Sequence, residues 1–473
     1  MSGYILLSLL FFVLVMLTVM TYYLRTVEKE QASQQEQDDS ANPAKRNNIV
    51  TTQTFVYTAM LLTIVGMLVS VYLILKGSIW EGHFMEWLNI VVRLMHITFG
   101  IAWIGASFYF VFLENALNRT SNVRDELAGN LWAIHGGGFY YLEKYKVAPK
   151  TIPRHLHWFK YEAYFTWLSG FCLLFVVYYF NAHSILIDKN ILDISAGVAI
   201  GIGIGSFVIA WVLYDLLCKT PLVKKGPWFA LVGFTAAVLF AWFYCQVFSA
   251  RAAYTHFGAM LGTLMAANVF FVIIPAQKAM VKAATEGLPL NPQLGKNAGL
   301  RSLHNNYLTL PVLFVMISNH FPTTFGYEYP WVIVAIISLG TAGVKHYLNI
   351  KEKGQLSVWV LPASVLILLS AAYISAPKPQ GICAEVINFS QVNTIIQNRC
   401  SSCHSAKPTD DFYKAPPNGV MYDTPEGIVQ LKDKIMQRVV LTHSMPQNNK
   451  TNMTEAEREV IRCWITQGAS LKQ

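Results

Sequence analysis

Apolar runs long enough to cross a lipid bilayer recur along most of this chain of 473 residues. A hydrocarbon core roughly 30 Å thick is crossed by a helix of about 20 apolar residues. Ten stretches have about this length, namely residues 4–24, 52–75, 89–113, 160–181, 192–218, 228–248, 255–275, 303–322, 330–349 and 355–375. Because 54% of the residues are hydrophobic and only 13% are charged, the sequence predicts an all-α, polytopic transmembrane bundle of about ten helices.

Lysine and arginine are concentrated in alternate loops of this predicted bundle. Short cytoplasmic loops collect such residues, so the basic loops are predicted to lie in the cytoplasm and the segment after the tenth run outside it. The net charge of +9 therefore reflects topology and does not indicate a nucleic-acid partner. The basic residues follow the third, fifth, seventh and ninth runs, at Lys144, Lys146, Lys150, Arg154, Lys219, Lys224, Lys225, Lys278, Lys282, Lys296, Arg301, Lys345, Lys351 and Lys353.

Two polar segments divide the chain into three predicted parts. Residues 25–48 are rich in Gln, Glu, Asp and Ser and have no apolar period, which is typical of a linker. Residues 376–381 end the last run with proline and glycine. We predict an N-terminal extension over 1–80 with two membrane helices, an eight-helix membrane domain over 83–376 and a small extracytoplasmic domain over 383–473.

The last part contains the sequence CSSCH at residues 400–404, which is the pattern of covalent haem attachment. The thiols of Cys400 and Cys403 would add to the haem vinyl groups, and His404 would ligate the iron. A disulfide or a zinc pair is the alternative, but further zinc ligands at suitable spacing are lacking nearby. The sequence therefore predicts one haem c in a small class I-like cytochrome c domain.

The second axial ligand is expected downstream of this motif. Met445 is followed by a proline that would stiffen its loop, and it is the first candidate. Met453 and His443 are the alternatives, and ligation by two histidines would lower the reduction potential. Cys383 and Cys463 lie in the same outward domain, where an oxidising compartment permits a disulfide between them.

Ionisable residues inside the predicted membrane bundle fall into two layers. Such residues ordinarily mark a site or a pathway, because they are costly to place in lipid. In the outer layer, imidazoles of His96, His256 and His320 could together ligate a b-type haem or another metal. The alternative is that each histidine is simply hydrogen-bonded near an interface.

The inner layer is more densely polar and supplies the candidates for substrate binding and catalysis. Its amides and imidazoles could read the donors and acceptors of a planar heterocycle, and Gly136–Gly138 would let backbone N–H groups approach it. The alternative is a set of helix caps and interfacial side chains. The candidates are His135, His155, His157, Glu162, His304, Asn305, Asn306 and His346.

From His83 to the C-terminus the sequence resembles the bacterial membrane-bound urate oxidases that carry a fused cytochrome c domain. Several long stretches match in order, which is more specific than the haem motif alone. The first eighty residues lie outside this resemblance. The matching stretches are 101–108, 135–140, 155–164, 254–275, 301–320 and the haem domain.

The resemblance implies an oxidoreductase that converts urate to 5-hydroxyisourate and passes electrons to its cytochrome c without forming hydrogen peroxide. The acceptor would be a soluble cytochrome c or a terminal oxidase of the respiratory chain. The protein would be a multi-pass protein of the bacterial inner membrane, with the haem domain on the periplasmic or outer face. An oligomer is compatible with the sequence.

Two other functions compete with this interpretation. One is a membrane-anchored cytochrome c that carries electrons without substrate chemistry, and the other is a redox-coupled purine transporter. The many polar residues of the inner layer disfavour a bare carrier. The fused haem domain disfavours a simple transporter.

Overall fold

The computed structural model of the chain describes residues 63–153, 156–355, 357–376, 381–383, 385–411, 413 and 415–471. The predicted helix over 4–24, the predicted linker and the first half of the run over 52–75 lie outside these residues. The chain divides into two units, residues 1–81 and 82–473. In the first unit the described residues include an apolar helix, Thr63–Leu75, within the predicted second run.

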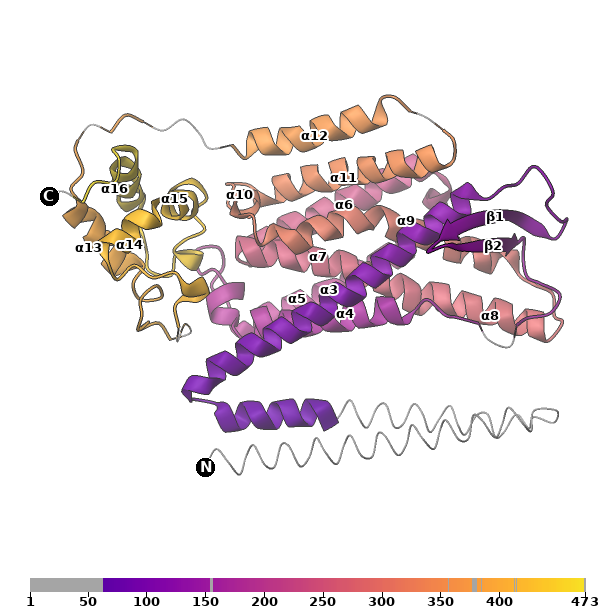
Figure 1. Cartoon of the computed structure of the whole chain (residues 1–473), viewed down its shortest axis with the longest axis horizontal. Coiled ribbons are helices and arrows are strands. Elements are labelled where there is room, and N and C mark those ends of the chain that lie inside the picture. The colour runs from indigo at the N-terminus through magenta and orange to yellow at the C-terminus, as the bar shows by residue number, and fades with distance from the viewer. Residues whose placement is uncertain are drawn as a thin grey trace. The chain divides into compact units, whose positions relative to one another are not determined.

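The second unit contains a bundle of long helices. These are α3 (Ile79–Ala116), which begins in the first unit, α4 (Tyr161–Leu173), α5 (Ala196–Lys219), α6 (Gly226–Val247), α7 (Ala250–Ala267), α8 (Ile274–Thr285), α9 (Pro292–Ser318), α10 (Pro322–Phe325), α11 (Pro330–Glu352) and α12 (Val360–Ile374). Short turns of helix complete it, at Leu174–Tyr179, Ala182–Leu186, Pro221–Lys224 and Asn268–Ile273. Figure 1 shows α5, α6, α7, α9 and α11 side by side, and α7 packs against α5, α6 and α9.

Six helices in the described part of the chain are long and apolar enough to cross a membrane, which indicates membrane association. They are Trp80–Ala116, Tyr161–Tyr179, Ala196–Lys219, Gly226–Val247, Ala250–Thr285 and Pro330–Glu352. The prediction of about ten spans is thus supported for six. Helix α9 has 27 residues, but Lys296, Arg301 and several amides make its first half polar, and α12 has only 15 residues.

A β-hairpin between α3 and α4 departs from the all-α prediction, although the chain is mostly helical as predicted. Strands β1 (Leu127–His135) and β2 (Gly138–Tyr145) pair antiparallel, and His135 lies opposite Gly138. Gly136 and Gly137 have φ of 57° and 81°, so they form a two-residue turn of the kind that glycine allows. The glycines predicted to admit a ligand therefore serve the turn, and a Cβ at Gly136 or Gly137 would meet nothing within 4 Å.

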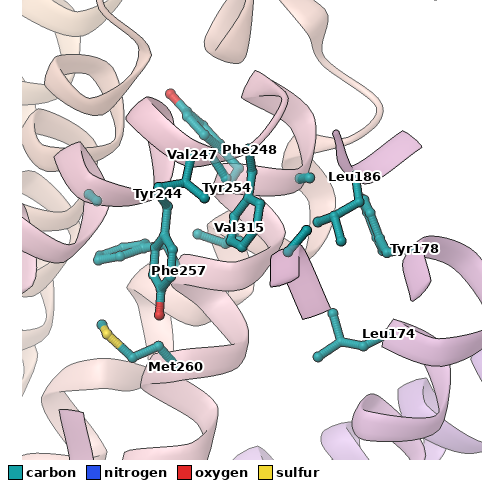
Figure 2. Close-up of a cluster of buried hydrophobic side chains, with 14 of the residues drawn as sticks. Leu174, Tyr178, Leu186, Tyr244, Val247, Phe248, Tyr254, Phe257, Met260 and Val315 are labelled. Atoms are coloured by element: carbon teal, nitrogen blue, oxygen red, sulfur yellow. The ribbon is translucent and has the colours of Figure 1, made fainter. Parts of the chain in front are cut away.

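The core of the bundle is built around α7. Figure 2 shows Tyr254, Phe257 and Val315 in one cluster of buried side chains from several helices. Tyr254 is 1% exposed, and its hydroxyl lies 2.8 Å from the carbonyl oxygens of both Thr324 and Pro330. Because a buried hydroxyl needs such partners, Tyr254 ties α7 to α10 and to the start of α11.

The C-terminal domain is a small helical fold with its own core. Its elements are α13 (Phe389–Arg399), α14 (Pro425–Gln430), α15 (Lys432–Ile435) and α16 (Glu455–Thr466), with short turns at Pro417–Gly419, Met436–Leu441 and Gln447–Asn449. The last helix packs against the first helix of the domain, since the rings of Trp464 and Phe389 lie 5.7 Å apart between α16 and α13. Thr454 caps α16, and its hydroxyl accepts from the Glu457 N–H.

Cys383 and Cys463 form a disulfide across this domain, with their Cα atoms 5.6 Å apart. This is the bridge that the sequence permits. It ties the segment before α13 to the buried side of α16, where Arg462 also donates to the Gly381 carbonyl at 2.8 Å. The segment that leads into the domain is therefore held against its last helix.

Gly258 allows α7 and α9 to approach each other closely. An added Cβ at Gly258 would lie 2.5 Å from Val315 Cγ1, whereas one at Gly262 would meet nothing within 4 Å. We expect Gly258→Ala to destabilise the protein by about 1–3 kcal/mol through overpacking. Gly262→Ala should be neutral or slightly stabilising, because alanine is the better helix former. Thermal unfolding in detergent compares the two variants, and equal melting temperatures would contradict this packing.

Candidate functional site

A buried ion pair lies at the end of the bundle where α5 and α9 meet. The Arg301 side chain is 7% exposed, and its Nη2 is 2.6 Å from Asp215 Oδ1. Its Nη1 donates to Asn268 Oδ1 at 3.2 Å, and the guanidinium lies 4.9 Å from the centre of the Tyr214 ring. The charge pattern of the sequence predicted Arg301 to lie in a cytoplasmic loop. A charge in an apolar helix must be paired, so Asp215 near the end of the fifth run was the signal that could have found this pair.

Amide side chains extend this network into α7 and α9. Asn268 is fully buried in the π-helical turn after α7, and its Nδ2 donates to Asn305 Oδ1 at 2.8 Å and to Tyr214 Oη at 3.1 Å. Asn305 Nδ2 donates to the Met265 carbonyl at 3.0 Å. These donors and acceptors satisfy one another, so the network stabilises the bundle and leaves little capacity for a ligand.

His304 borders this network. Its Nδ1 is 2.8 Å from Tyr214 Oη, and its ring stacks on Phe229 with centroids 4.8 Å apart. Among the described residues, Nε2 makes no hydrogen bond. The structure therefore brings the predicted residues His304 and Asn305 together with Tyr214, and it leaves Nε2 of His304 without a hydrogen-bond partner among the described residues.

A second polar cluster joins α9 to α11. Asn349 Nδ2 donates to Asn306 Oδ1 at 3.0 Å, and both residues are buried. Asn306 Nδ2 and Asn349 Oδ1 are buried without a hydrogen-bond partner in the described structure. Lys345, one turn before Asn349, is 2% exposed and places Nζ 3.3 Å from the centre of the Phe108 ring. This cluster thus offers one unused donor, one unused acceptor and a cation.

The remaining predicted residues of the inner layer lie nearer the surface. His346 is exposed, and its Nδ1 is 2.7 Å from Tyr307 Oη. His157 is also exposed, and its Nε2 lies 3.9 Å from Glu162 Oε1, while Glu162 Oε2 is buried without a partner in the described structure. His135 is exposed beside the hairpin turn. His155 lies outside the described residues.

The three outer histidines occupy different settings. His256 is fully buried, and both ring nitrogens are engaged, Nδ1 with the Ala252 carbonyl at 2.9 Å and Nε2 with Tyr179 Oη at 3.1 Å. His96 Nδ1 lies 3.0 Å from the Thr166 carbonyl oxygen, and His320 is exposed after α9.

In the described part of the chain, three metal-type ligand atoms come together only at Cys383, Glu459 and Cys463. The two thiols of that group form the disulfide. A second haem or metal at His96, His256 and His320 therefore stays a prediction, because the structure does not bring these histidines together in one group of metal ligands.

The CSSCH segment follows α13 and leaves both thiols outside any disulfide. His404 Nδ1 is 3.0 Å from the Val420 carbonyl oxygen, which can only accept, so Nδ1 carries the proton and Nε2 remains free for a metal. Burial lowers the pKa of His404, which favours the neutral, ligating imidazole. Burial, and then the neighbouring Cys403, raise the pKa of the Cys400 thiol to about 12.

The Met445 loop is fixed on both sides by backbone contacts. Met445 N donates to the Arg438 carbonyl at 2.9 Å, and its own carbonyl accepts from Arg458 Nη1 at 2.8 Å. The side chains of Met445 and Cys400 pack against the same apolar core. An attachment thiol and a thioether ligand on one core fit a covalently attached haem.

The two alternative axial ligands have other surroundings. His443 is half exposed and its Nδ1 lies 3.6 Å from Glu455 Oε1. Met453 is 3% exposed and forms part of the domain core beside the start of α16. These contacts favour Met445, which stays a prediction.

Residues 82–376 match the family model described as "Urate oxidase N-terminal". The match covers the bundle from α3 to α12 and both of its polar clusters. Neither the curated proteins nor the solved structures contain a match to the chain.

Asp215 should be essential for stability because Arg301 is buried against it. Removing one partner of a buried ion pair leaves an uncompensated charge, which costs on the order of 3 kcal/mol. We expect Asp215→Asn to lower the melting temperature clearly. Lys219 also lies 2.6 Å from Asp215, but its side chain is 68% exposed, so Lys219→Met should have a small effect. An equal loss of melting temperature in the two variants would contradict the expectation that the buried pair of Asp215 and Arg301 contributes more to stability than the exposed pair with Lys219.

Proposed function

The chain belongs to the urate oxidase N-terminal family, and from this premise we propose that it is an integral-membrane oxidoreductase. It oxidises urate to 5-hydroxyisourate in the helix bundle and passes the electrons to a haem c in its own C-terminal domain. Six membrane-type helices, the family match and the CSSCH segment support this proposal together.

The main support for the substrate site is the amide pair of Asn306 on α9 and Asn349 on α11, which has one donor and one acceptor without a partner in the described structure. Urate is a flat ring system with N–H donors and carbonyl acceptors, and it is mostly a monoanion at neutral pH. Asn306 Nδ2 can donate to it and Asn349 Oδ1 can accept from it, and both atoms are buried without another partner in the described structure. Lys345, one turn before Asn349 on α11, would supply a positive charge to balance that of urate.

The Arg301 network has a different part in this proposal. Its amides and its ion pair satisfy one another, so it positions α9 and does not bind substrate. His304 and Glu162 are the candidates for accepting protons, because His304 Nε2 and Glu162 Oε2 have no hydrogen-bond partner among the described residues.

The reaction has to release two electrons and one proton from the urate monoanion. The urate monoanion and water give 5-hydroxyisourate, one proton and two electrons, so the oxygen comes from water and hydrogen peroxide is not a product. When bound, haem c accepts one electron at a time. Cys400 and Cys403 would hold it, with His404 and Met445 as axial ligands. Two successive electron transfers would complete each turnover, and a respiratory acceptor would then remove the electrons.

Direct contact between the C-terminal domain and the bundle supports electron transfer within one chain. Gln447 Nε2 donates to the Ser184 carbonyl at 3.1 Å. Asn448 Nδ2 donates to the Ser184 and Ile187 carbonyls at 3.1 and 2.9 Å. These amides come two and three residues after Met445, so the loop of the proposed axial ligand is the part of the domain that contacts the bundle.

Anaerobic addition of urate to the purified, oxidised protein tests the function, with the haem absorption bands as the readout. We expect urate to reduce the haem, and Asn349→Leu to lower kcat/KM by about 10- to 100-fold, since it leaves a substrate donor unpaired at about 1–3 kcal/mol.

Asn115→Leu is the matched control. Asn115 lies on α3, and its Nδ2 donates to Glu352 Oε2 at the end of α11, the helix that carries Asn349. Asn115 thus contacts α11 but lies outside the amide pair. If the haem of the unaltered protein responds to dithionite but never to urate, the function is wrong and the carrier or transporter interpretation replaces it. Reduction that is equally impaired in both variants would instead reject the amide pair as the substrate site.

Met445 and Met453 provide a matched pair for the axial ligand. Met445→Leu should change the spectrum of the oxidised haem and lower its reduction potential, because a thioether ligand favours the reduced iron. Met453→Leu nearly conserves the volume of a core side chain and should leave both properties unaltered. A changed spectrum in Met453→Leu alone would assign the iron to Met453.

A further inference from the structure

Three arginines are gathered where the C-terminal domain contacts the bundle. Arg93 lies on α3, Arg251 on α7 and Arg438 in the turn after α15. The start of α7 adjoins this contact, because Ser249 N donates to the Leu186 carbonyl at 2.9 Å, in the turn whose carbonyls accept from the amides of Gln447 and Asn448. The charge of Arg251 also acts on both of the other arginines. In the described part of the chain, none of the three guanidinium groups pairs with a carboxylate.

Neutral side chains orient Arg251 within this group. Its Nε donates to Asn319 Oδ1 at 3.1 Å, and neither terminal nitrogen makes a hydrogen bond or ion pair with another described residue. Asn319 Nδ2 donates in turn to Thr255 Oγ1 at 3.4 Å, and Tyr178 Oη lies 2.7 Å from the same oxygen. A guanidinium held by its Nε presents a planar fork that matches an oxyanion with two acceptor atoms.

The position of Arg251 is unfavourable unless an anion is present. Arg251 lies in the first turn of α7, where the helix dipole is positive and a cation destabilises the helix. Burial and then the charge of Arg251 lower the pKa of Arg438, as expected for like charges brought near each other. Three cations beside a helix N-terminus form the electrostatic field that an anion requires.

Arg438 also connects this field to the proposed haem site. Its carbonyl accepts from the backbone N–H of Met445 at 2.9 Å. Tyr413, which also lies within range of the Arg251 charge, donates to Gln447 Oε1 at 2.6 Å in the loop that contacts the bundle. The backbone of Arg438 is therefore bonded directly to the proposed axial-ligand residue, in the same part of the domain as the loop that contacts the bundle.

We propose that Arg251 and Arg438, with Arg93, form a binding site for a delocalised oxyanion between the bundle and the C-terminal domain, an inference that rests on the proposed function. The anion is either a propionate of the attached haem or the urate monoanion entering from the outer face. Both present two acceptor atoms in one plane. A propionate would fix the orientation of the haem over the bundle, whereas urate would be concentrated there before oxidation.

Arg251→Gln and Arg438→Gln in the full-length, haem-loaded protein distinguish the two anions. If the site holds a propionate, each variant should lower the ratio of reduced to oxidised haem about tenfold at a fixed potential, equivalent to about 59 mV, with urate affinity unchanged. If it holds urate, the dissociation constant of urate for the pre-reduced protein should rise at least tenfold with the potential unchanged. Arg438→Gln keeps the test valid if Arg251→Gln does not fold.

Lys434→Gln is the control, because it removes the same charge from an exposed position of the same domain. The inference is overturned if both arginine variants match Lys434→Gln in potential and in urate affinity. Arg251→Lys adds a geometric test, since it retains the charge without the fork and should restore only part of the lost effect. Failure of urate to reduce the unaltered protein would reject the proposed function. The reduction potentials of the haem in the arginine variants would still show whether the site binds a propionate.

Discussion

The bundle depends on one buried charge being balanced inside it. Arg301 enters α9 in a region where water cannot solvate it, and Asp215 on α5 and Asn268 after α7 supply its partners at 2.6 and 3.2 Å. Three helices must therefore keep their relative depth and rotation, because a shift of one would leave a charge or an amide without a partner. This requirement also fixes the face of α9 that turns toward α11.

That fixed face has a consequence for chemistry. The Arg301 network uses its own donors and acceptors completely, whereas Asn306 and Asn349, on the next part of α9 and on α11, leave one donor and one acceptor unused. A protein interior rarely retains such atoms without a purpose. A satisfied network that holds a rigid frame beside an unsatisfied pair is the arrangement that a substrate site requires.

The proposed path of electrons follows from where the C-terminal domain contacts the bundle. The amides of Gln447 and Asn448 reach backbone carbonyls near Leu186, and the loop that contains them also contains Met445. The same contact adjoins the start of α7, which carries Arg251, because Ser249 N donates to the Leu186 carbonyl at 2.9 Å. The loop thus contributes a proposed iron ligand and a set of docking hydrogen bonds beside the proposed anion site, so a haem bound there would lie next to the bundle.

The sequence by itself determined the features that depend on composition and local spacing. Long apolar runs predicted the membrane-type helices, and CSSCH identified the only segment of the sequence that has the pattern of covalent haem attachment, because each signal lies within one short stretch of the chain. It also named His304, Asn305 and Asn306 as candidates for the substrate site, and the structure places all three in polar clusters.

Tertiary structure alone decided which residues meet. Asp215, Asn268 and Arg301 come from three helices, and no local pattern reveals that they share one network. The same holds for the unused pair of Asn306 and Asn349, and the glycines beside His135 proved to be a hairpin turn. The reason is physical: periodicity shows which face of a helix is apolar, but only packing between helices decides which polar atoms find partners and which remain free.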